Sequence, residues 1–305
     1  MSAQKHEKYQ HLIGRARALS PTPCAVAHPC DESSLRGAVE AAQTGLIRPI
    51  LVGPTARIEA LAAQFELDLS MCERVDAPHS VGSAEAAVKL AREGKAEMLM
   101  KGSLHTDELM AAVVKRDTGL RTARRISHCF IMDVPAIDRV VVITDAAVNI
   151  FPTLEDKMHI VQNALDLARA LGVERPRVAI LSAMETVNPK VPSTIEAAAL
   201  CKMAERGQIT GGLLDGPLAL DNAIDLGAAQ IKKITSPVAG LADILVVPDL
   251  EAGNILAKQL EHLAGAASCG VVLGARVPIA LTSRSDPVLS RVASAALARE
   301  MAQRR

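Results

Sequence analysis

The segment VPIALTSRSDP, residues 277–287, ends a short apolar run with a group of side chains that could do chemistry. In open α/β sheets, ligands lie beyond the carboxyl ends of the strands. A helix that begins there favours a phosphate or a carboxylate at its N-terminus, and Arg284 offers a bidentate fork for the same anion. Asp286 could equally cap the helix, with Arg284 as an exposed surface charge. The spacing alone leaves both interpretations open.

The segment MKGSLHTDE, residues 100–108, also joins a predicted strand to a predicted helix. Lys101 supplies a point charge, and Gly102 lets a ligand approach the backbone closely. An ordinary strand-to-helix turn explains the same pattern. We expect His105 to be packed, or to lie beside the helix cap, rather than to act as a general base.

Three arginines, Arg121, Arg124 and Arg125, lie close to Ser127 in the segment LRTARRISH. An exposed basic loop is the simplest interpretation. If two or three of these side chains lie in a cleft, they would instead bind a polyphosphate such as that of coenzyme A.

Two acidic, glycine-containing segments follow, 211–228 and 242–260. The first contains Asp215, Asp221 and Asp225, whose oxygens could bind Mg²⁺, although turn-forming aspartates are the simpler explanation. In the second, Gly253 and Asn254 resemble a helix N-cap directed at an anion or a ribose. The four segments together favour a substrate that carries phosphate.

Short strands rich in Val, Ile and Leu must position these turns. The predicted strands are 24–28, 49–53, 97–102, 139–144, 178–183, 243–248, 270–274 and 278–283. Nearly continuous apolar runs of this length are typical of parallel strands that are covered on both faces. Because helical patterns alternate with them, the sequence predicts an α/β protein with parallel, Rossmann-like sheets.

Four of the helical segments have recognisable ends. They are 155–171, 193–207, 254–263 and the segment that begins at Pro287. Ser193 and Glu196 have the spacing of a capping box, and Pro287 suits the first position of a helix.

The composition excludes several classes of protein. Of the 305 residues, 49% are apolar and 22% are charged, which is typical of a globular chain and not of a disordered one. The formal net charge is zero, with one Tyr, three Phe and no Trp, so we expect no binding to nucleic acid. The eight histidines lack the spacing of metal ligands, and neither common nucleotide-binding fingerprint is present, so we expect no metal site and no cofactor.

The six cysteines are scattered without a C-x-x-C pair, and the N-terminal residues are polar. This pattern predicts a reduced, cytoplasmic protein. The longest apolar stretch, near 264–282, is interrupted by Arg276 and Pro278, so we expect no membrane-spanning helix.

Five sequence blocks carry a resemblance to a known family. In order along the chain they are M-K-G-S-x-H-T, I-S-H-x-F-I-M, D-G-P-L-A-L-D-N-A-I, A-D-I-L-V-V-P-D-L-E-A-G-N and S-R-S-D. Over residues 10–300 the chain resembles the phosphate acetyltransferase and phosphate butyryltransferase family. The resemblance implies an isocitrate/isopropylmalate-dehydrogenase-like fold, with two α/β domains flanking a cleft, in a homodimer. Residues 1–122 with 271–305 would form the first domain, and residues 123–270 the second.

The resemblance also implies a reaction, in which acyl-CoA and phosphate give CoA and acyl phosphate in a ternary complex. Asp286 would take the proton of the CoA thiol, Ser283 would bond the developing oxyanion, and Arg284 would hold phosphate. Lys101, Ser127 and Asn254 would contribute to substrate binding. The long acetyltransferases carry an arginine a few residues after the H-T pair, whereas here none occurs before Arg116.

The absence of that arginine gives Arg121, Arg124 or Arg125 as the alternative phosphate clamp, which is nearer to the butyryltransferase pattern. The resemblance implies transfer of a short acyl group, acetyl first, with butyryl-type specificity as the alternative.

Two other functions are weighed against this one. A decarboxylating dehydrogenase of the same fold would need a catalytic Lys–Tyr pair, and the only tyrosine is Tyr9 near the N-terminus. A catalytically silent module that binds acyl-CoA or acyl phosphate is the second alternative. The presence of Ser283, Arg284 and Asp286 together favours the enzyme.

Overall fold

The computed structural model describes residues 7–283 and 286–304, and these form two units of internal packing. The terminal unit contains Glu7–Arg124 and Cys269–Arg305, and the central unit contains Arg125–Ser268. These are units of packing. That they are separate domains, with boundaries after 122 and 270, stays a prediction.

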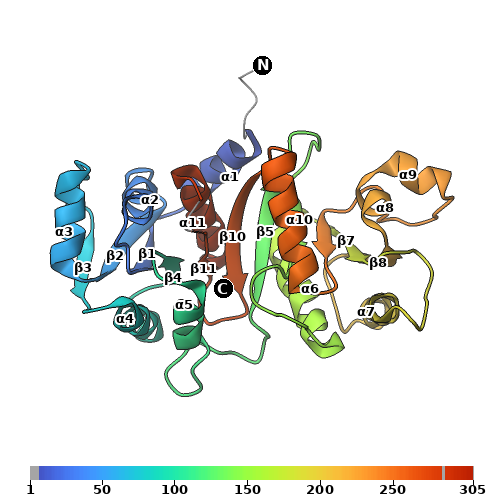
Figure 1. The fold of residues 1–305 in the computed structure, drawn as a ribbon, viewed down its shortest axis with the longest axis horizontal. Coiled ribbons are helices and arrows are strands. Elements are labelled where there is room, and N and C mark those ends of the chain that lie inside the picture. The colour runs from blue at the N-terminus through green and yellow to red at the C-terminus, as the bar shows by residue number, and fades with distance from the viewer. Residues whose placement is uncertain (1–6, 284–285, 305) are drawn as a thin grey trace. The chain divides into compact units, whose positions relative to one another are not determined.

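The strands of the terminal unit form a mostly parallel sheet in the order β3-β2-β1-β4-β11-β10 (Figure 1). Parallel pairing joins all of them except β10 and β11, which are antiparallel. The strands are β1 (Thr22–Ala27), β2 (Ile47–Gly53), β3 (Glu73–Asp76), β4 (Met98–Lys101), β10 (Ala267–Leu273) and β11 (Ile279–Ala280). Because β4 and β11 are parallel neighbours, their carboxyl ends bring Lys101 and Thr282 to the same edge of this sheet.

The helices of this unit pack in two groups, which lie on opposite sides of the strands in Figure 1. One group is α1 (Glu7–Arg17), α2 (Glu32–Gln43) and α11 (Val288–Ala302), and the other is α4 (Ser80–Arg92) and α5 (Thr106–Val113). Helix α3 (Thr55–Gln64) packs against α2 and β3. Helix α2 begins at a side-chain cap, since Asp31 Oδ1 accepts from Ser34 N at 2.7 Å.

The strands of the central unit pair in the order β5-β6-β9-β7-β8. Only β5 and β6 are antiparallel. The strands are β5 (Ser127–Asp133), β6 (Val141–Thr144), β7 (Arg177–Leu181), β8 (Leu213–Leu218) and β9 (Ile244–Val246). Helices α6 (Leu154–Ala170) and α7 (Pro192–Glu205) pack together, α10 (Leu250–Leu263) packs against β5 and β6, and the short α8 (Leu220–Ile224) and α9 (Leu226–Ile231) pair.

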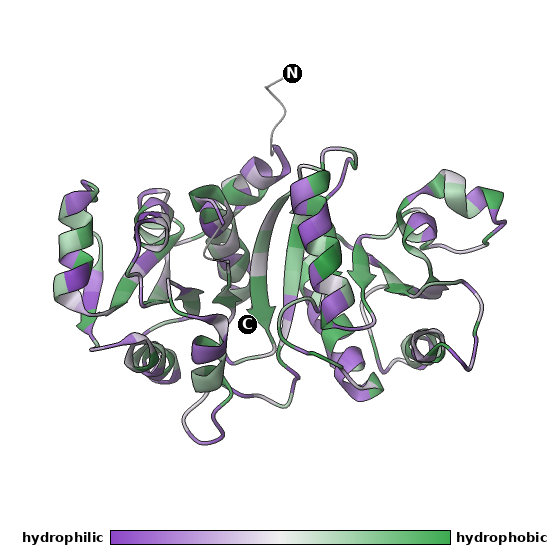
Figure 2. Cartoon of the chain, viewed as in Figure 1, coloured by the Kyte–Doolittle hydropathy of each residue, from purple (hydrophilic) through white to green (hydrophobic). Residues whose placement is uncertain are grey.

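The mixed α/β fold with mostly parallel strands is confirmed, and every predicted strand overlaps an observed one. In Figure 2 many strand residues are hydrophobic, and the helices carry both hydrophobic and hydrophilic residues. The prediction of an α/β fold rested on apolar strands of this kind alternating with helical patterns. None of the helices that the structure describes is long and apolar enough to cross a membrane.

Three strands were missed. β3 has the sequence ERVD and is largely exposed, so it lacks an apolar run. β8 contains Gly216 and Pro217, which usually indicate a turn. β5 begins with Ser127-His128, directly after the arginine-rich segment that was interpreted as a loop.

Two predicted helix starts and one cap were wrong. Helix α7 has Val191 at its N-cap and Pro192 in its first turn, and the Ser193 hydroxyl bonds Ser182 instead of forming a capping box. Pro287 is the N-cap of α11 rather than its first residue. Helix α10 begins four residues before the predicted cap Asn254, because Asp249 accepts a hydrogen bond from Ala252 N at 2.9 Å and caps the helix there.

Candidate active site

The carboxyl end of β11 holds Ser283 and Asp286 close together. The Ser283 backbone N–H donates to Asp286 Oδ2 at 2.8 Å, and Asp286 N donates to Ser283 O at 3.3 Å. Ser283 is exposed and Asp286 is half-buried. Helix α11 has Pro287 at its cap, so Asp286 does not occupy the capping position that competed with a catalytic role. The two residues predicted to be catalytic therefore lie within one short turn. Arg284, between them in sequence, lies outside the described residues.

Lys101 lies next to this turn. Its side chain is buried at the end of β4, and Nζ donates to Thr282 O at 3.3 Å and to Gly102 O at 3.5 Å. A buried ammonium group at this position supplies positive charge immediately before Ser283. Gly102 is required by close packing, because a Cβ there would lie 2.4 Å from the carbonyl oxygens of both Ala27 and His28.

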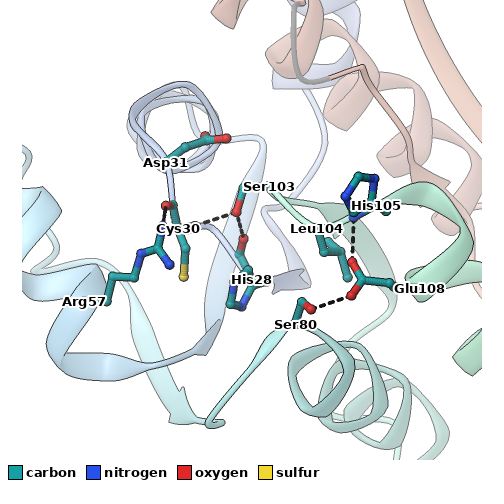
Figure 3. A pocket seen from close by; sticks show the side chains of 9 residues that line it. All are labelled: His28, Cys30, Asp31, Arg57, Ser80, Ser103, Leu104, His105 and Glu108. Atoms are coloured by element: carbon teal, nitrogen blue, oxygen red, sulfur yellow. Dashed lines mark hydrogen bonds between the residues drawn. The ribbon is translucent and has the colours of Figure 1, made fainter.

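A pocket of about 350 Å³ lies in the terminal unit, at the carboxyl ends of β1 and β4 (Figure 3). Its lining residues are His28, Cys30, Asp31, Arg57, Ser80, Ser103, Leu104, His105 and Glu108. The Glu108 carboxylate accepts from the Ser80 hydroxyl and from His105 N, and Ser103 Oγ donates to His28 O at 2.8 Å. These bonds hold the rim of the pocket in one arrangement.

Two histidines in this pocket have roles that the sequence did not fully specify. His105 is exposed and is itself the N-cap residue of α5, whereas we expected it to be packed or to lie beside the cap. His28 has φ of +55°, in the left-handed region, and its Nδ1 is 3.0 Å from Ser83 Oγ. Burial and the nearby Arg57 lower the pKa of His28, which favours the neutral form of its imidazole. No sequence pattern had indicated His28 or Arg57.

In the central unit, the loop after β6 is built around the buried Asp145. Its carboxylate accepts from Ala147 N at 2.9 Å, from Val148 N at 3.1 Å and from the Asn149 side chain at 2.6 Å. Burial raises the pKa of Asp145, and these hydrogen bonds oppose the shift. Arg125 is held by the same loop, because its Nε donates to Asn149 Oδ1 at 2.7 Å.

Of the three arginines that were weighed as a phosphate clamp, Arg125 is therefore engaged with protein groups. It also lies 3.4 Å from Asp156. Arg121 is exposed, and Arg124 is half-buried, with its backbone N–H donating to Thr122 Oγ1 at 3.0 Å. Both belong to the terminal unit, and which of the three arginines contacts an anion stays a prediction.

Ser127 and Asn254, both predicted to bind substrate, lie in the central unit. Ser127 is fully buried and its Oγ accepts from Asn163 Nδ2 at 2.7 Å, so it has a packing partner that the sequence did not indicate. Asn254 is exposed within α10, and its Nδ2 donates to Ala146 O at 3.4 Å. Gly253 is required by packing, because a Cβ there would lie 2.8 Å from Val247 Cγ2.

The acidic residues of segment 211–228 serve turns and ion pairs, which was the simpler of the two interpretations. Asp225 Oδ1 accepts from Gly227 N at 2.7 Å and caps α9, Asp215 accepts from Gly216 N at 2.8 Å, and Asp221 lies 3.4 Å from Lys232 Nζ. Within residues 7–283 and 286–304, no three His, Cys, Asp or Glu side chains are grouped so that they could hold a metal ion.

Cys129 is the cysteine nearest to the predicted site residues in sequence, and it is not placed as a nucleophile. It is completely buried in β5, with its Sγ 3.7 Å from Thr144 Oγ1, and burial raises its pKa to about 12. A thiol with such a pKa supplies almost no thiolate at pH 7. We expect Cys129→Ala to leave kcat within a few-fold of the unmodified chain. Trapping of an acyl group on Cys129, or ping-pong kinetics that disappear in the variant, would contradict this result.

Comparison with known proteins finds a matching family and similar enzymes. A model of the family described as "Phosphate acetyl/butaryl transferase" matches residues 80–299. A "Phosphate acetyltransferase" from Rhizobium meliloti is 65% identical over 98% of this chain and 94% of its own length. A "Probable phosphate butyryltransferase" from Bacillus subtilis is 44% identical over 95% and 97% of the two chains. A branched-chain phosphotransacylase from Enterococcus faecalis superposes with a TM-score of 0.79, at 30% identity, over 92% of this chain and 99% of that one.

Proposed function

The chain belongs to the phosphate acetyl/butyryl transferase family, and we propose from this membership how its residues carry out acyl transfer between coenzyme A and phosphate. The activity follows from the relatives: this is a phosphate acetyltransferase, which interconverts acetyl-CoA plus phosphate and CoA plus acetyl phosphate. The resemblance identified from the sequence blocks is thereby confirmed. The roles of individual residues remain our proposal.

In the direction that forms acetyl-CoA, Asp286 takes the proton of the CoA thiol, and the thiolate sulfur forms a bond to the carbonyl carbon of acetyl phosphate. Ser283 Oγ donates a hydrogen bond to the carbonyl oxygen as it becomes negatively charged. The bond from carbon to the phosphate oxygen then breaks, and the positive charge of Arg284 stabilises the phosphate as it leaves. Lys101, whose Nζ donates to Thr282 O, adds positive charge next to Ser283.

The contact between Ser283 and Asp286 is the observation that supports this assignment most. The 2.8 Å hydrogen bond from Ser283 N to Asp286 Oδ2 supports it, because the proposed base and the proposed oxyanion donor lie within one turn. Acyl transfer to a thiol needs these two groups in proximity, and each must be fixed before the reaction to be effective. In this mechanism no step requires a metal or a bound cofactor, and CoA takes part as a substrate.

A thiol-release assay tests the activity directly. Acetyl-, propionyl- and butyryl-CoA are each incubated with the protein, with and without phosphate, and free CoA thiol is measured. We expect release that depends on phosphate and is fastest with acetyl-CoA, in line with the relative that is 65% identical. Release without phosphate would identify a thioesterase instead. A preference for butyryl-CoA would support the alternative, the specificity of the butyryltransferases, and no release would support a silent binding module.

Arg284 provides a separate test of phosphate binding. Removal of a hydrogen bond to a charged group costs roughly 1.5–3 kcal/mol, or about 10- to 150-fold in affinity. We therefore expect Arg284→Ala to raise the KM for phosphate or acyl phosphate by that factor, with thermal stability unchanged. Arg121→Ala and Arg124→Ala measured in parallel show whether either side chain shares this role. An unchanged KM in Arg284→Ala would remove that residue from the site.

Several broader features are also part of the proposal. We propose that the two units are α/β domains flanking a cleft, as in isocitrate and isopropylmalate dehydrogenases, with Asn254 contributing a substrate contact. We propose further that the protein acts in the cytoplasm as a homodimer, without a nucleic-acid or membrane partner. Size-exclusion chromatography with light scattering tests the dimer, and Asn254→Ala tests the substrate contact through the KM for acyl-CoA.

A further inference from the structure

Arg291 is a fully buried cation in helix α11, and no sequence pattern indicated it. Each of its three nitrogens donates to a different partner. Nε donates to Ser33 Oγ at 2.9 Å, Nη1 to Thr282 Oγ1 at 2.9 Å, and Nη2 to Ser283 O at 3.1 Å. Charged groups buried to this degree are uncommon and are retained where all their hydrogen bonds are used.

Two of these three acceptors belong to the turn that carries the predicted catalytic residues. Thr282 directly precedes Ser283, and the third acceptor, Ser33, extends the link to Asp286, since Ser33 Oγ donates to Asp286 O at 3.4 Å. One guanidinium group therefore joins both ends of the catalytic turn to the start of helix α2. The hydrogen bond from Ser283 N to Asp286 Oδ2 joins the same two residues that these contacts hold.

Only an arginine can make this set of contacts. Its planar group presents donors in several directions at once, whereas a lysine presents a single ammonium on a flexible stem. Helix α2 is also shaped around the arginine side chain: a Cβ at Gly37 would lie 2.8 Å from Arg291 Cδ and 3.0 Å from Arg291 Cβ. Because Gly37 leaves that space, α2 and α11 pack closely enough for Ser33 to reach Nε.

We propose, building on the function proposed above, that Arg291 is a positioning residue for catalysis. It holds the Thr282 side chain and the Ser283 carbonyl directly and the Asp286 carbonyl through Ser33, and so keeps the Ser283 hydroxyl and the Asp286 carboxylate in their working arrangement. Arg291 touches no substrate in this role. Its loss therefore lowers the rate of the chemical step far more than it weakens the binding of acyl-CoA or phosphate.

The same helix offers a matched control. Arg299 lies two turns further along α11 and is also fully buried, but its guanidinium donates to backbone carbonyls at the end of α1 and beyond it, Ala16 O and Ser20 O. Arg299→Lys therefore removes a buried guanidinium group from the same helix, but one whose hydrogen bonds are to the backbone near α1 and not to Ser283. Its effects show what destabilising α11 does by itself.

The experiment compares Arg291→Lys with Arg299→Lys in the full chain. For each variant, kcat and the two KM values are measured by thiol release, and the melting temperature by thermal unfolding. We expect both variants to lower the melting temperature by a similar amount. Arg291→Lys should also lower kcat at least tenfold, with each KM within about threefold. Arg299→Lys should leave kcat within about twofold. Equal losses of kcat in the two variants would overturn the proposal.

Two further measurements separate positioning from general damage. In a Ser283→Ala background, Arg291→Lys should lower kcat by a smaller factor than it does in the unmodified chain, because the hydroxyl, one of the two groups that it positions, is already absent. A full, multiplicative loss would contradict a role through Ser283. Amide hydrogen exchange of the segment around Ser283 should speed up in Arg291→Lys and stay unchanged in Arg299→Lys.

The hydrogen-exchange measurement does not depend on enzyme activity, so it tests the positioning role even if the assay detects no thiol release. A chain that releases no thiol with any acyl-CoA would defeat the proposed function, whereas unchanged exchange around Ser283 in Arg291→Lys would defeat the positioning role. The two failures are therefore distinguishable.

Discussion

Replacing Asp286 with Asn is expected to lower kcat by about 10²–10⁴-fold while leaving the melting temperature nearly unchanged. Asn keeps an oxygen that can accept the hydrogen bond that Ser283 N donates to Oδ2 at 2.8 Å, so the turn keeps its shape. Asn cannot take a proton from the CoA thiol, and the loss of a general base costs a factor of this size. Steady-state thiol release together with thermal unfolding measures both effects.

Asp225→Asn serves as the control for this substitution. Asp225 Oδ1 also accepts backbone hydrogen bonds, from Gly227 N and Ala228 N, and Asn caps a helix about as well as Asp. We expect its activity and stability to match those of the unmodified chain. Turnover in Asp286→Asn at the unmodified rate would show that Asp286 only holds the turn, and another group would have to accept the thiol proton.

The fold could be predicted largely from local sequence, because its signals are local. Strands such as β1 and β2 are short apolar runs, and the helices between them have regular spacing. The errors arose where local signals conflict with tertiary packing. β8 forms despite Gly216 and Pro217, since it pairs along β7. Helix α10 begins at Leu250 because Asp249, four positions before Gly253, caps it.

Some residues of the candidate site could be predicted from local sequence, and others could not. Ser283 and Asp286 could be identified because a strand end, two polar residues and a helix start are contiguous in sequence, and the family resemblance gave them roles. Arg291 could not, because its function depends on Ser33, more than 250 positions away, meeting it across two helices. The one available signal was an arginine within the small and apolar residues of α11, at a position that the helix buries.

Burial also decides what the residues that the sequence did identify are able to contact. Ser127 was predicted to bind substrate from its place beside three arginines, but it is fully buried and bonded to Asn163. Lys101 was predicted as a point charge for a ligand, and its ammonium also supports the backbone at Thr282. A sequence gives the type and order of such groups, whereas their solvent exposure depends on which elements cover them.

Replacing Ser283 with Ala is expected to lower kcat by about 10²–10³-fold, which is the usual cost of removing one donor to a developing oxyanion. The substitution keeps the backbone N–H that donates to Asp286 Oδ2 and the carbonyl that accepts from Arg291 Nη2, so it removes the hydroxyl and leaves the turn in place. Because the base is retained, kcat/KM should keep the pH dependence of the unmodified enzyme, whereas Asp286→Asn should lose the fall at low pH that protonation of the base causes. Thiol-release kinetics across pH 5–9, described by the same rate equation for both variants, separate the two roles. If Ser283→Ala retained full kcat, or lost activity through a changed pH profile instead of a uniform drop, Ser283 would not be the oxyanion donor and the backbone around it would have to supply that hydrogen bond.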